Sequence, residues 1–199
     1  DFGWMDEVMD MLDENGIKAI LATPSGARPP WLAQKYPEVL RVNNVRQKMI
    51  YGGRHNHCLT SPIYREKVAQ MNEQLALRYG KHPALGMWHI SNEYGGDCHC
   101  PLCQHAFQEW LKARYGTIDA LNDAWRKGSW SHRFNDFNQI ESPTTPDWLG
   151  ENESHGLKLA WNRFTSWHHC DFYAHEIEPL KRITPDIPCT TNMMGTYPV

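Results

Sequence analysis

Apolar side chains recur along the chain with two different periods. Trp4, Val8, Met11 and Leu12 follow a helical spacing, and Gly16 comes shortly afterwards as a helix stop. This spacing predicts an N-terminal helix that carries these four side chains on its apolar face.

Short, continuous apolar runs separate further helical segments. The runs predict strands at residues 17–24, 83–91 and 187–191. Helical spacing of apolar residues predicts helices at residues 61–80, near 107–116, at 117–126 and at 157–182. Strands that alternate with helices predict βαβ units and a parallel sheet, in which functional groups gather where the strands end.

Two stretches of the chain lack a clear period. Residues 26–44 hold several prolines, so we expect a long functional loop without regular structure. Residues 117–155 are polar and aromatic, with one short helix at their start. We find no internal repeat, no low-complexity tract and no domain linker.

Charge and composition exclude several classes of function. The 199 residues include 20 Lys and Arg against 23 Asp and Glu, a formal net charge of −3. This balance gives no electrostatic basis for binding nucleic acid or an anionic membrane, and no apolar run is long enough to span a bilayer. The 9 tryptophans favour a large aromatic core first and sugar-stacking surfaces second. Because the chain starts at Asp1, the absence of a signal peptide does not indicate its compartment.

An Asn-Glu pair marks the end of the second predicted strand. Asn92 and Glu93 follow the run ALGMWHIS directly, which places both side chains at the carboxyl-terminal rim of the sheet. A glutamate there can act as a general acid, and the asparagine beside it can bind a sugar hydroxyl. A solvated glutamate in an ordinary turn is the alternative that the dipeptide alone leaves open.

Four cysteines lie at spacings that suit a metal. Cys98, Cys100 and Cys103 form C-x-C-x-x-C, and Cys58 precedes them by forty residues. Four thiolates favour a closed, tetrahedral, structural zinc site over buried free thiols or a redox pair. His57 and His99 are spare ligand candidates that are better explained as surface or hydrogen-bonded histidines. Cys170 and Cys189 fit no metal spacing and are expected to be small core residues.

Several sequence blocks, in order, resemble glycoside hydrolase family 42, the β-galactosidases. The blocks are TPSGARPPWLAQKYPEVL, GGRHNHCLTSPIYR, NEYGGDCHCPLCQHAFQEWL, LNDAWRKGSWSHRFNDF and TTNMMG, which together span most of the chain. The resemblance implies a (β/α)8 barrel in which Glu93 is the general acid/base. It also implies that Asn92 and Arg54 bind the sugar in subsite −1 and that Trp130 borders the sugar site. Members of the family with a four-cysteine zinc site imply the ligand set Cys58, Cys98, Cys100 and Cys103.

The resemblance also implies that residues 1–199 are the middle of the catalytic domain, roughly strands three to five. The nucleophilic carboxylate of a retaining enzyme is then expected on a later strand, outside this chain. None of the glutamates in loops and helices is nominated as that nucleophile; these are Glu141, Glu151, Glu153, Glu176 and Glu178.

The expected function is a retaining β-galactosidase acting on terminal β-galactosides of oligosaccharides. The alternatives are a β-glucosidase or α-arabinosidase of the same clan, or a non-catalytic, zinc-stabilised carbohydrate-binding module. Zinc-mediated nucleic-acid binding is disfavoured by the acidic charge. The resemblance further suggests a homotrimer and a cytoplasmic location.

Overall fold

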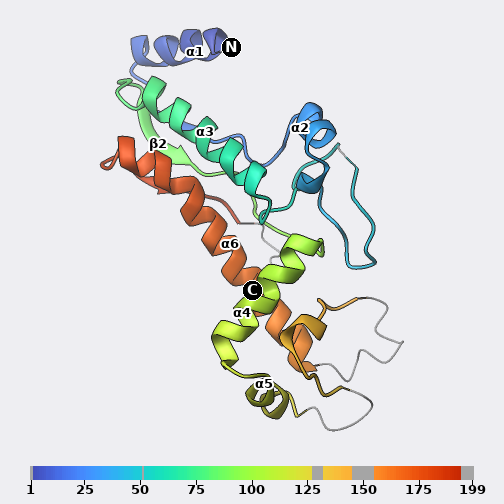
Figure 1. The fold of residues 1–199 in the computed structure, drawn as a ribbon. Coiled ribbons are helices and arrows are strands. Elements are labelled where there is room, and N and C mark those ends of the chain that lie inside the picture. The colour runs from blue at the N-terminus through green and yellow to red at the C-terminus, as the bar shows by residue number, and fades with distance from the viewer. Residues whose placement is uncertain (1, 51, 127–131, 145–154, 194–199) are drawn as a thin grey trace.

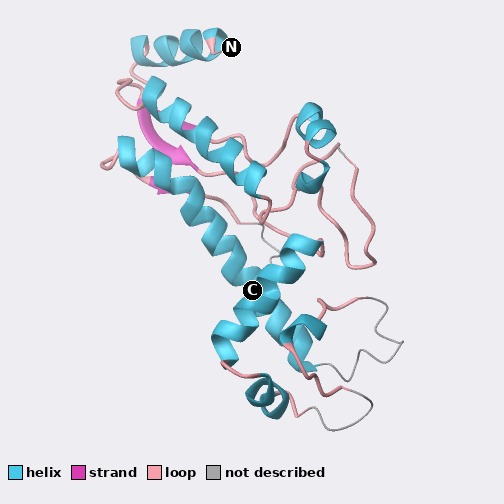
Figure 2. Cartoon of the chain, in the orientation of Figure 1, coloured by secondary structure: helices cyan, strands magenta, loops and turns pink. Residues whose placement is uncertain are grey.

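The computed structural model describes residues 2–50, 52–126, 132–144 and 155–193. Six α-helices, two short 3-10 helices and three strands follow one another along these residues (Figures 1 and 2). Their order is α1 (Gly3–Glu14), β1 (Ala19–Ala22), α2 (Pro30–Lys35), η1 (Pro37–Val39), α3 (Pro62–Tyr79), β2 (Leu85–His89), α4 (Pro101–Tyr115), α5 (Ile118–Ala124), η2 (Phe137–Gln139), α6 (His155–Ile183) and β3 (Cys189–Thr190).

The three strands form one parallel sheet in the order β1-β2-β3. Leu21 on β1 is in register with Trp88 on β2, and Trp88 is in register with Cys189 on β3. The predicted parallel sheet is therefore confirmed, with shorter strands than the apolar runs indicated. Because the strands are parallel, the residues that follow each of them meet at the same edge.

Local signals in the sequence explain where the helices begin and end. The Ser61 hydroxyl accepts a hydrogen bond from the Tyr64 amide at 3.4 Å, and Pro62 occupies the first position of α3. Thr117 caps α5 in the same way, through the Ala120 amide at 3.2 Å. These caps lie where the sequence predicted helix starts.

The long helix α6 runs alongside α3 at one end and α4 at the other (Figure 1), and it contributes to two hydrophobic cores. Its C-terminal half packs with α3 and the sheet, where Trp88 and Phe172 are fully buried. Its N-terminal half packs with α4 and α5, where Phe107 and Phe164 lie beside the four-cysteine cluster. A displacement of α6 would thus disturb both cores.

Helix α1 contacts the protein through a different face from the one predicted. Trp4, Val8 and Met11 are exposed in the described structure, whereas Met9 is 1 % exposed. Asp6 on this second face pairs with Arg78 of α3. The prediction was wrong for Trp4, Val8 and Met11 because the apolar face of α1 is broad. Its other edge, with Phe2, Met5, Met9 and Leu12, packs against the core, and Asp6 beside it pairs with Arg78.

Three further expectations need correction. The segment 26–44 was expected to be irregular, yet it contains the short helices α2 and η1, each started by a proline that is compatible with a first helical turn. Cys170 was expected in the core but is exposed, because it lies on the outward side of α6. Cys189 is only half-buried.

None of the helices within the described residues is long and apolar enough to cross a membrane.

Candidate active site

The backbone turns sharply where β2 ends. Ser91 and Glu93 both adopt positive φ angles, of 52° and 45°. This left-handed region is unfavourable for a residue with a Cβ by roughly 1 kcal/mol or more. Such a conformation persists only where the surrounding structure holds it, so the contacts of residues 91–95 matter for the position of Glu93.

Residues that follow the two neighbouring strands hold this turn through hydrogen bonds. The Ser91 amide donates to the Thr23 hydroxyl at 2.8 Å, just after β1. The Glu93 amide donates to the Asn192 side-chain oxygen at 3.2 Å, just after β3. The loops that follow all three strands thus meet around Glu93, as the parallel sheet predicted.

Arg54 forms an ion pair with Glu93. Its guanidinium Nη1 lies 2.5 Å from Glu93 Oε2, and the side chains are 57 % and 24 % exposed. The half-buried Asn92 lies directly before Glu93. The structure therefore brings together Glu93, Asn92 and Arg54, which the sequence had assigned to one site. Trp130 lies outside the described residues.

The four predicted metal ligands also come together. Cys58, Cys98, Cys100 and Cys103 are buried, and their sulfur atoms all lie within 4.8 Å of one another. Cys58 Sγ is 3.4 Å from Cys100 Sγ and 3.5 Å from Cys103 Sγ. These distances are far too long for disulfide bonds.

This geometry fits a tetrahedral zinc site. Zinc–sulfur bonds of about 2.3 Å place the sulfurs of a tetrahedron about 3.8 Å apart, close to the spacing observed. Hydrogen bonds from Cys103 and Cys58 lower the pKa of the Cys100 thiol, whereas the hydrogen bonds with Cys100 raise the pKa values of the Cys58 and Cys103 thiols. The four cysteines could therefore hold one zinc ion with no open position for water.

Polar groups around the cluster support a set of thiolates. The Val42 amide donates to Cys98 Sγ at 3.4 Å. The Thr60 hydroxyl lies 3.0 Å from Cys103 Sγ and 3.1 Å from His168 Nε2, which connects the cluster to α6. Such second contacts orient metal ligands in known sites.

A buried arginine ties the cysteine cluster to the turn at Glu93. Arg41 is 8 % exposed, and its guanidinium donates to the carbonyls of His57 at 3.3 Å and Gly95 at 3.1 Å. His57 precedes Cys58, and Gly95 follows Glu93 by two positions. Gly96 leaves room for this contact, because a Cβ there would clash with Arg41 Nη1.

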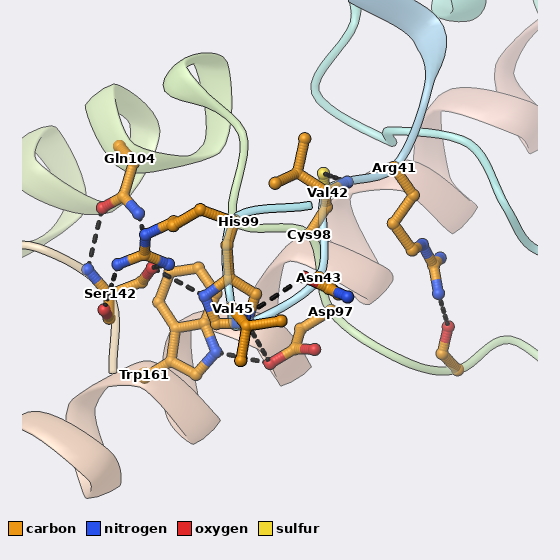
Figure 3. A network of polar contacts seen from close by, with 12 residues as sticks. Arg41, Val42, Asn43, Val45, Asp97, Cys98, His99, Gln104, Ser142 and Trp161 are labelled. Atoms are coloured by element: carbon orange, nitrogen blue, oxygen red, sulfur yellow. Dashed lines mark hydrogen bonds and ion pairs between the residues drawn. The ribbon is translucent and has the colours of Figure 1, made fainter. Parts of the chain in front are cut away.

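A polar network packs the cysteine loop onto α6 (Figure 3). The His99 ring stacks on Trp161 at 4.7 Å, and its Nδ1 lies 2.7 Å from the Ser142 hydroxyl. Asp97 lies 3.0 Å from His99 Nε2 and accepts a hydrogen bond from Trp161 Nε1 at 2.7 Å. Burial raises the pKa of Asp97, but these two hydrogen bonds outweigh it and lower the pKa to about 2.

The two spare histidines are not in the four-sulfur group. His57 is buried and stacks on Tyr64, with ring centroids 4.2 Å apart. His99 is buried in the network just described. The expectation of a hydrogen-bonded role is confirmed for His99, whereas a surface position is wrong for both, since each is covered by an aromatic ring.

Sequence reasoning missed the contact between Tyr94 and Glu176. Glu176, at 0 % exposure on α6, accepts a hydrogen bond from the Tyr94 hydroxyl. Burial raises the pKa of Glu176 to about 7, although Ser25 and Tyr94 act in the opposite direction. Glu176 lies four positions after Phe172, on the buried face of the helix. A glutamate at an otherwise apolar helical position was the sequence feature that could have indicated a buried carboxyl.

Comparisons with known proteins agree with this architecture. The crystal structure of the cold-adapted β-galactosidase from Rahnella sp. R3 superposes with a TM-score of 0.95 at 56 % identity, covering 99 % of this chain and 29 % of that one. The catalytic domain of a β-amylase from Paenibacillus polymyxa, at 14 % identity and a TM-score of 0.65, shares the fold alone. The chain is thus a segment of a (β/α)8 barrel with a candidate glycosidase site at its rim.

Sequence relatives define the family. The profile of glycoside hydrolase family 42, described as β-galactosidase, matches residues 1–199, and the chain belongs to this family. β-Galactosidase GanA of Bacillus subtilis is 60 % identical over 198 residues, and BglY of Alicyclobacillus acidocaldarius is 58 % identical over 197. Each match includes 99 % of this chain. The chain spans only 29 % of the length of GanA and 28 % of the length of BglY.

The left-handed turn at Glu93 yields a first prediction for stability. Replacing Glu93 by Gly or by Ala removes the same ion pair, but only glycine relieves the positive φ. We expect Glu93→Gly to be more stable than Glu93→Ala by roughly 1 kcal/mol, measured by denaturant unfolding of the full-length protein. Equal stability of the two variants would show that residue 93 is not left-handed in solution.

The buried carboxyl of Glu176 yields a prediction for pH dependence. Its pKa is raised from 4.5 to about 7 on folding, so between these values the folded protein holds a proton that the unfolded chain has released. This contribution to stability is complete below about pH 4.5 and is lost as the pH rises through 7. Glu176→Gln removes the effect, so we expect the variant to gain stability relative to wild type by up to roughly 3 kcal/mol from pH 5 to pH 8.

The matched control is Glu178→Gln, two positions further along the same helix. Glu178 is exposed and pairs with Arg182 at 3.1 Å. Its substitution should leave the pH dependence of the unfolding free energy unchanged. Parallel pH curves for wild type and Glu176→Gln would contradict a raised pKa at Glu176.

Proposed function

We propose that the whole protein is a retaining β-galactosidase that removes terminal galactose from oligosaccharides. The observation that carries the proposal is the Glu93–Arg54 pair, at 2.5 Å, on the carboxyl-terminal rim of a family 42 barrel. The relatives GanA and BglY are β-galactosidases, which supports galactose as the sugar. β-Glucosidase and α-arabinosidase activities are the alternative specificities. Assays with nitrophenyl β-galactoside and nitrophenyl β-glucoside distinguish a β-galactosidase from a β-glucosidase.

In this proposal Glu93 has two successive roles. It first donates a proton to the glycosidic oxygen, while a second carboxylate about 5–5.5 Å away attacks the anomeric carbon. It then removes a proton from the water that releases the galactosyl-enzyme intermediate. Arg54 and Asn92 bind the sugar hydroxyls beside it. The nucleophile lies outside this chain, and the buried Glu176, which faces Tyr94, does not suit that role.

The cysteine cluster is proposed as a structural zinc site. Cys58 lies on the loop that carries Arg54, while Cys98, Cys100 and Cys103 follow Glu93. When bound, zinc supplies a cross-link between these two loops and takes no part in the chemistry. The four thiolates thereby fix the distance between Arg54 and Glu93. That residues 1–199 are only the middle part of the catalytic domain, that the protein is a homotrimer and that it is cytoplasmic stay predictions from the sequence.

The acid/base role of Glu93 predicts a specific pattern of activity. In the full-length enzyme, Glu93→Ala should reduce kcat/KM on substrates with poor leaving groups by about 100-fold or more. An aryl galactoside whose leaving group needs no protonation should be affected much less. Hydrolysis of the intermediate also needs the base, so this variant should accumulate a galactosyl-enzyme.

Added azide tests the assignment most directly, because azide attacks without losing a proton. It should restore turnover of Glu93→Ala and give a β-galactosyl azide, identified by the anomeric coupling constant in NMR. Azide should not accelerate the wild type. Absence of rescue, or formation of the α-anomer, would assign the acid/base of a retaining enzyme elsewhere.

The zinc proposal predicts a separation of stability from chemistry. Metal analysis of purified protein should give about one zinc per chain. Cys100→Ser should lose the metal and lower Tm by several degrees or more, yet keep most of its turnover at low temperature. The exposed Cys170→Ser is the matched control and should keep both zinc and Tm. A metal-free wild type with unchanged Tm in Cys100→Ser would refute the site.

A further inference from the structure

The carboxyl of Glu176 is buried where an apolar side chain would fit. Its neighbours on the same face of α6 are Phe172 and Leu180, both 0 % exposed. Burying a carboxyl in such surroundings is unfavourable unless a partner compensates for the lost hydration. The Tyr94 hydroxyl, one residue after Glu93, donates a hydrogen bond to this carboxyl, and the Ser25 side chain is a second partner.

The aromatic ring of Tyr94 is held by the same helix. Its ring centroid lies 6.4 Å from that of His169, 6.3 Å from that of Phe172 and 6.1 Å from that of Tyr173. Tyr94 is 6 % exposed. Ring packing restricts where Tyr94 can lie, and the hydroxyl contact with Glu176 sets its depth and direction. The residue after Glu93 is therefore anchored on α6.

Helix α6 is itself a fixed support. The side-chain amide of the fully buried Asn72, on α3, donates to the Glu176 carbonyl at 2.9 Å. Arg65 of α3 pairs with Asp171 at 2.5 Å, five positions earlier on α6. The anchor for Tyr94 thus belongs to the rigid packing of two helices and not to a mobile loop.

We propose that Glu176 is a positioning residue for Glu93, which it aligns by holding the Tyr94 hydroxyl on α6. The left-handed backbone of Glu93 needs restraint on both sides. Thr23 supplies it at Ser91, before Glu93, Asn192 supplies it at Glu93 itself, and Tyr94 supplies it afterwards. Without the Tyr94–Glu176 contact, the turn relaxes and the Glu93 carboxyl moves away from the glycosidic oxygen. This inference rests on the proposed acid/base function of Glu93.

The test compares two substrates in the full-length enzyme. Phenyl β-galactoside needs a proton on its leaving group, whereas dinitrophenyl β-galactoside does not. The ratio of their kcat/KM values reports proton donation in the first step and is independent of the fraction of enzyme that is folded. Loss of stability alone therefore cannot change this ratio.

Tyr94→Phe and Glu176→Leu should each lower the phenyl-to-dinitrophenyl ratio about tenfold or more. Glu176→Gln should keep a ratio close to wild type, because its amide oxygen still accepts from the Tyr94 hydroxyl. The double variant Tyr94→Phe/Glu176→Leu should be no worse than either single one, since both remove the same hydrogen bond. Tyr79→Phe is the matched control, because it removes a phenol hydroxyl from a residue that is also buried, and this hydroxyl bonds the Asp6 carboxylate of α1 at 2.8 Å, at the opposite end of α3.

Glu93→Ala, measured alongside, separates the two proposals. If Glu93→Ala lowers the ratio but Tyr94→Phe and Glu176→Leu do not, the positioning role is wrong and the acid/base role stands. An equal fall in Tyr79→Phe would likewise overturn the positioning role. If Glu93→Ala leaves the ratio unchanged, the proposed function and this inference fail together.

Discussion

The turn after β2 is the constraint on which the candidate site depends. Glu93 adopts a backbone conformation that its own side chain disfavours, and the surrounding structure over-determines it. Contacts come from the loop after β1, from the loop after β3, from Arg41 and from α6. Because these contacts originate in separate parts of the chain, Glu93 reaches its position only when the sheet and α6 are both assembled.

The cysteine cluster restrains the same rim from the opposite side. It joins the loop that carries Arg54 to the loop that follows Glu93, and Arg41 links both loops through backbone carbonyls. The network of Asp97, His99 and Trp161 then packs the cluster against the N-terminal half of α6. The two hydrophobic cores along α6 therefore meet at the site, one through the cysteines and one through Tyr94.

Much of this arrangement could be predicted from the sequence. Alternating apolar runs and helical spacings indicated the parallel sheet and most helices, because a strand or helix buried on one side leaves a local periodic pattern. The Asn-Glu pair at a strand end and the cysteine spacing indicated the two sites, since both depend on residues close together in the chain. Family-level motifs added Arg54, whose contact with Glu93 the structure shows.

Features that depend on the choice between several apolar faces were not predictable. Helix α1 has a broad apolar face, and only the edge that holds Met9, next to the ion pair of Asp6 with Arg78, is buried. Cys170 looks like a core residue until the rotation of α6 places it outside.

The sequence by itself determined most helices and strands, the rim position of Glu93 and the set of four thiols, because each depends on the order or spacing of residues along the chain. Only the tertiary structure decided how Glu93 is held. The residues that bond the turn at positions 91–95 lie at positions 23, 41, 176 and 192. Contacts over such separations follow from the packing of β1, β3 and α6 around β2, which no local pattern records.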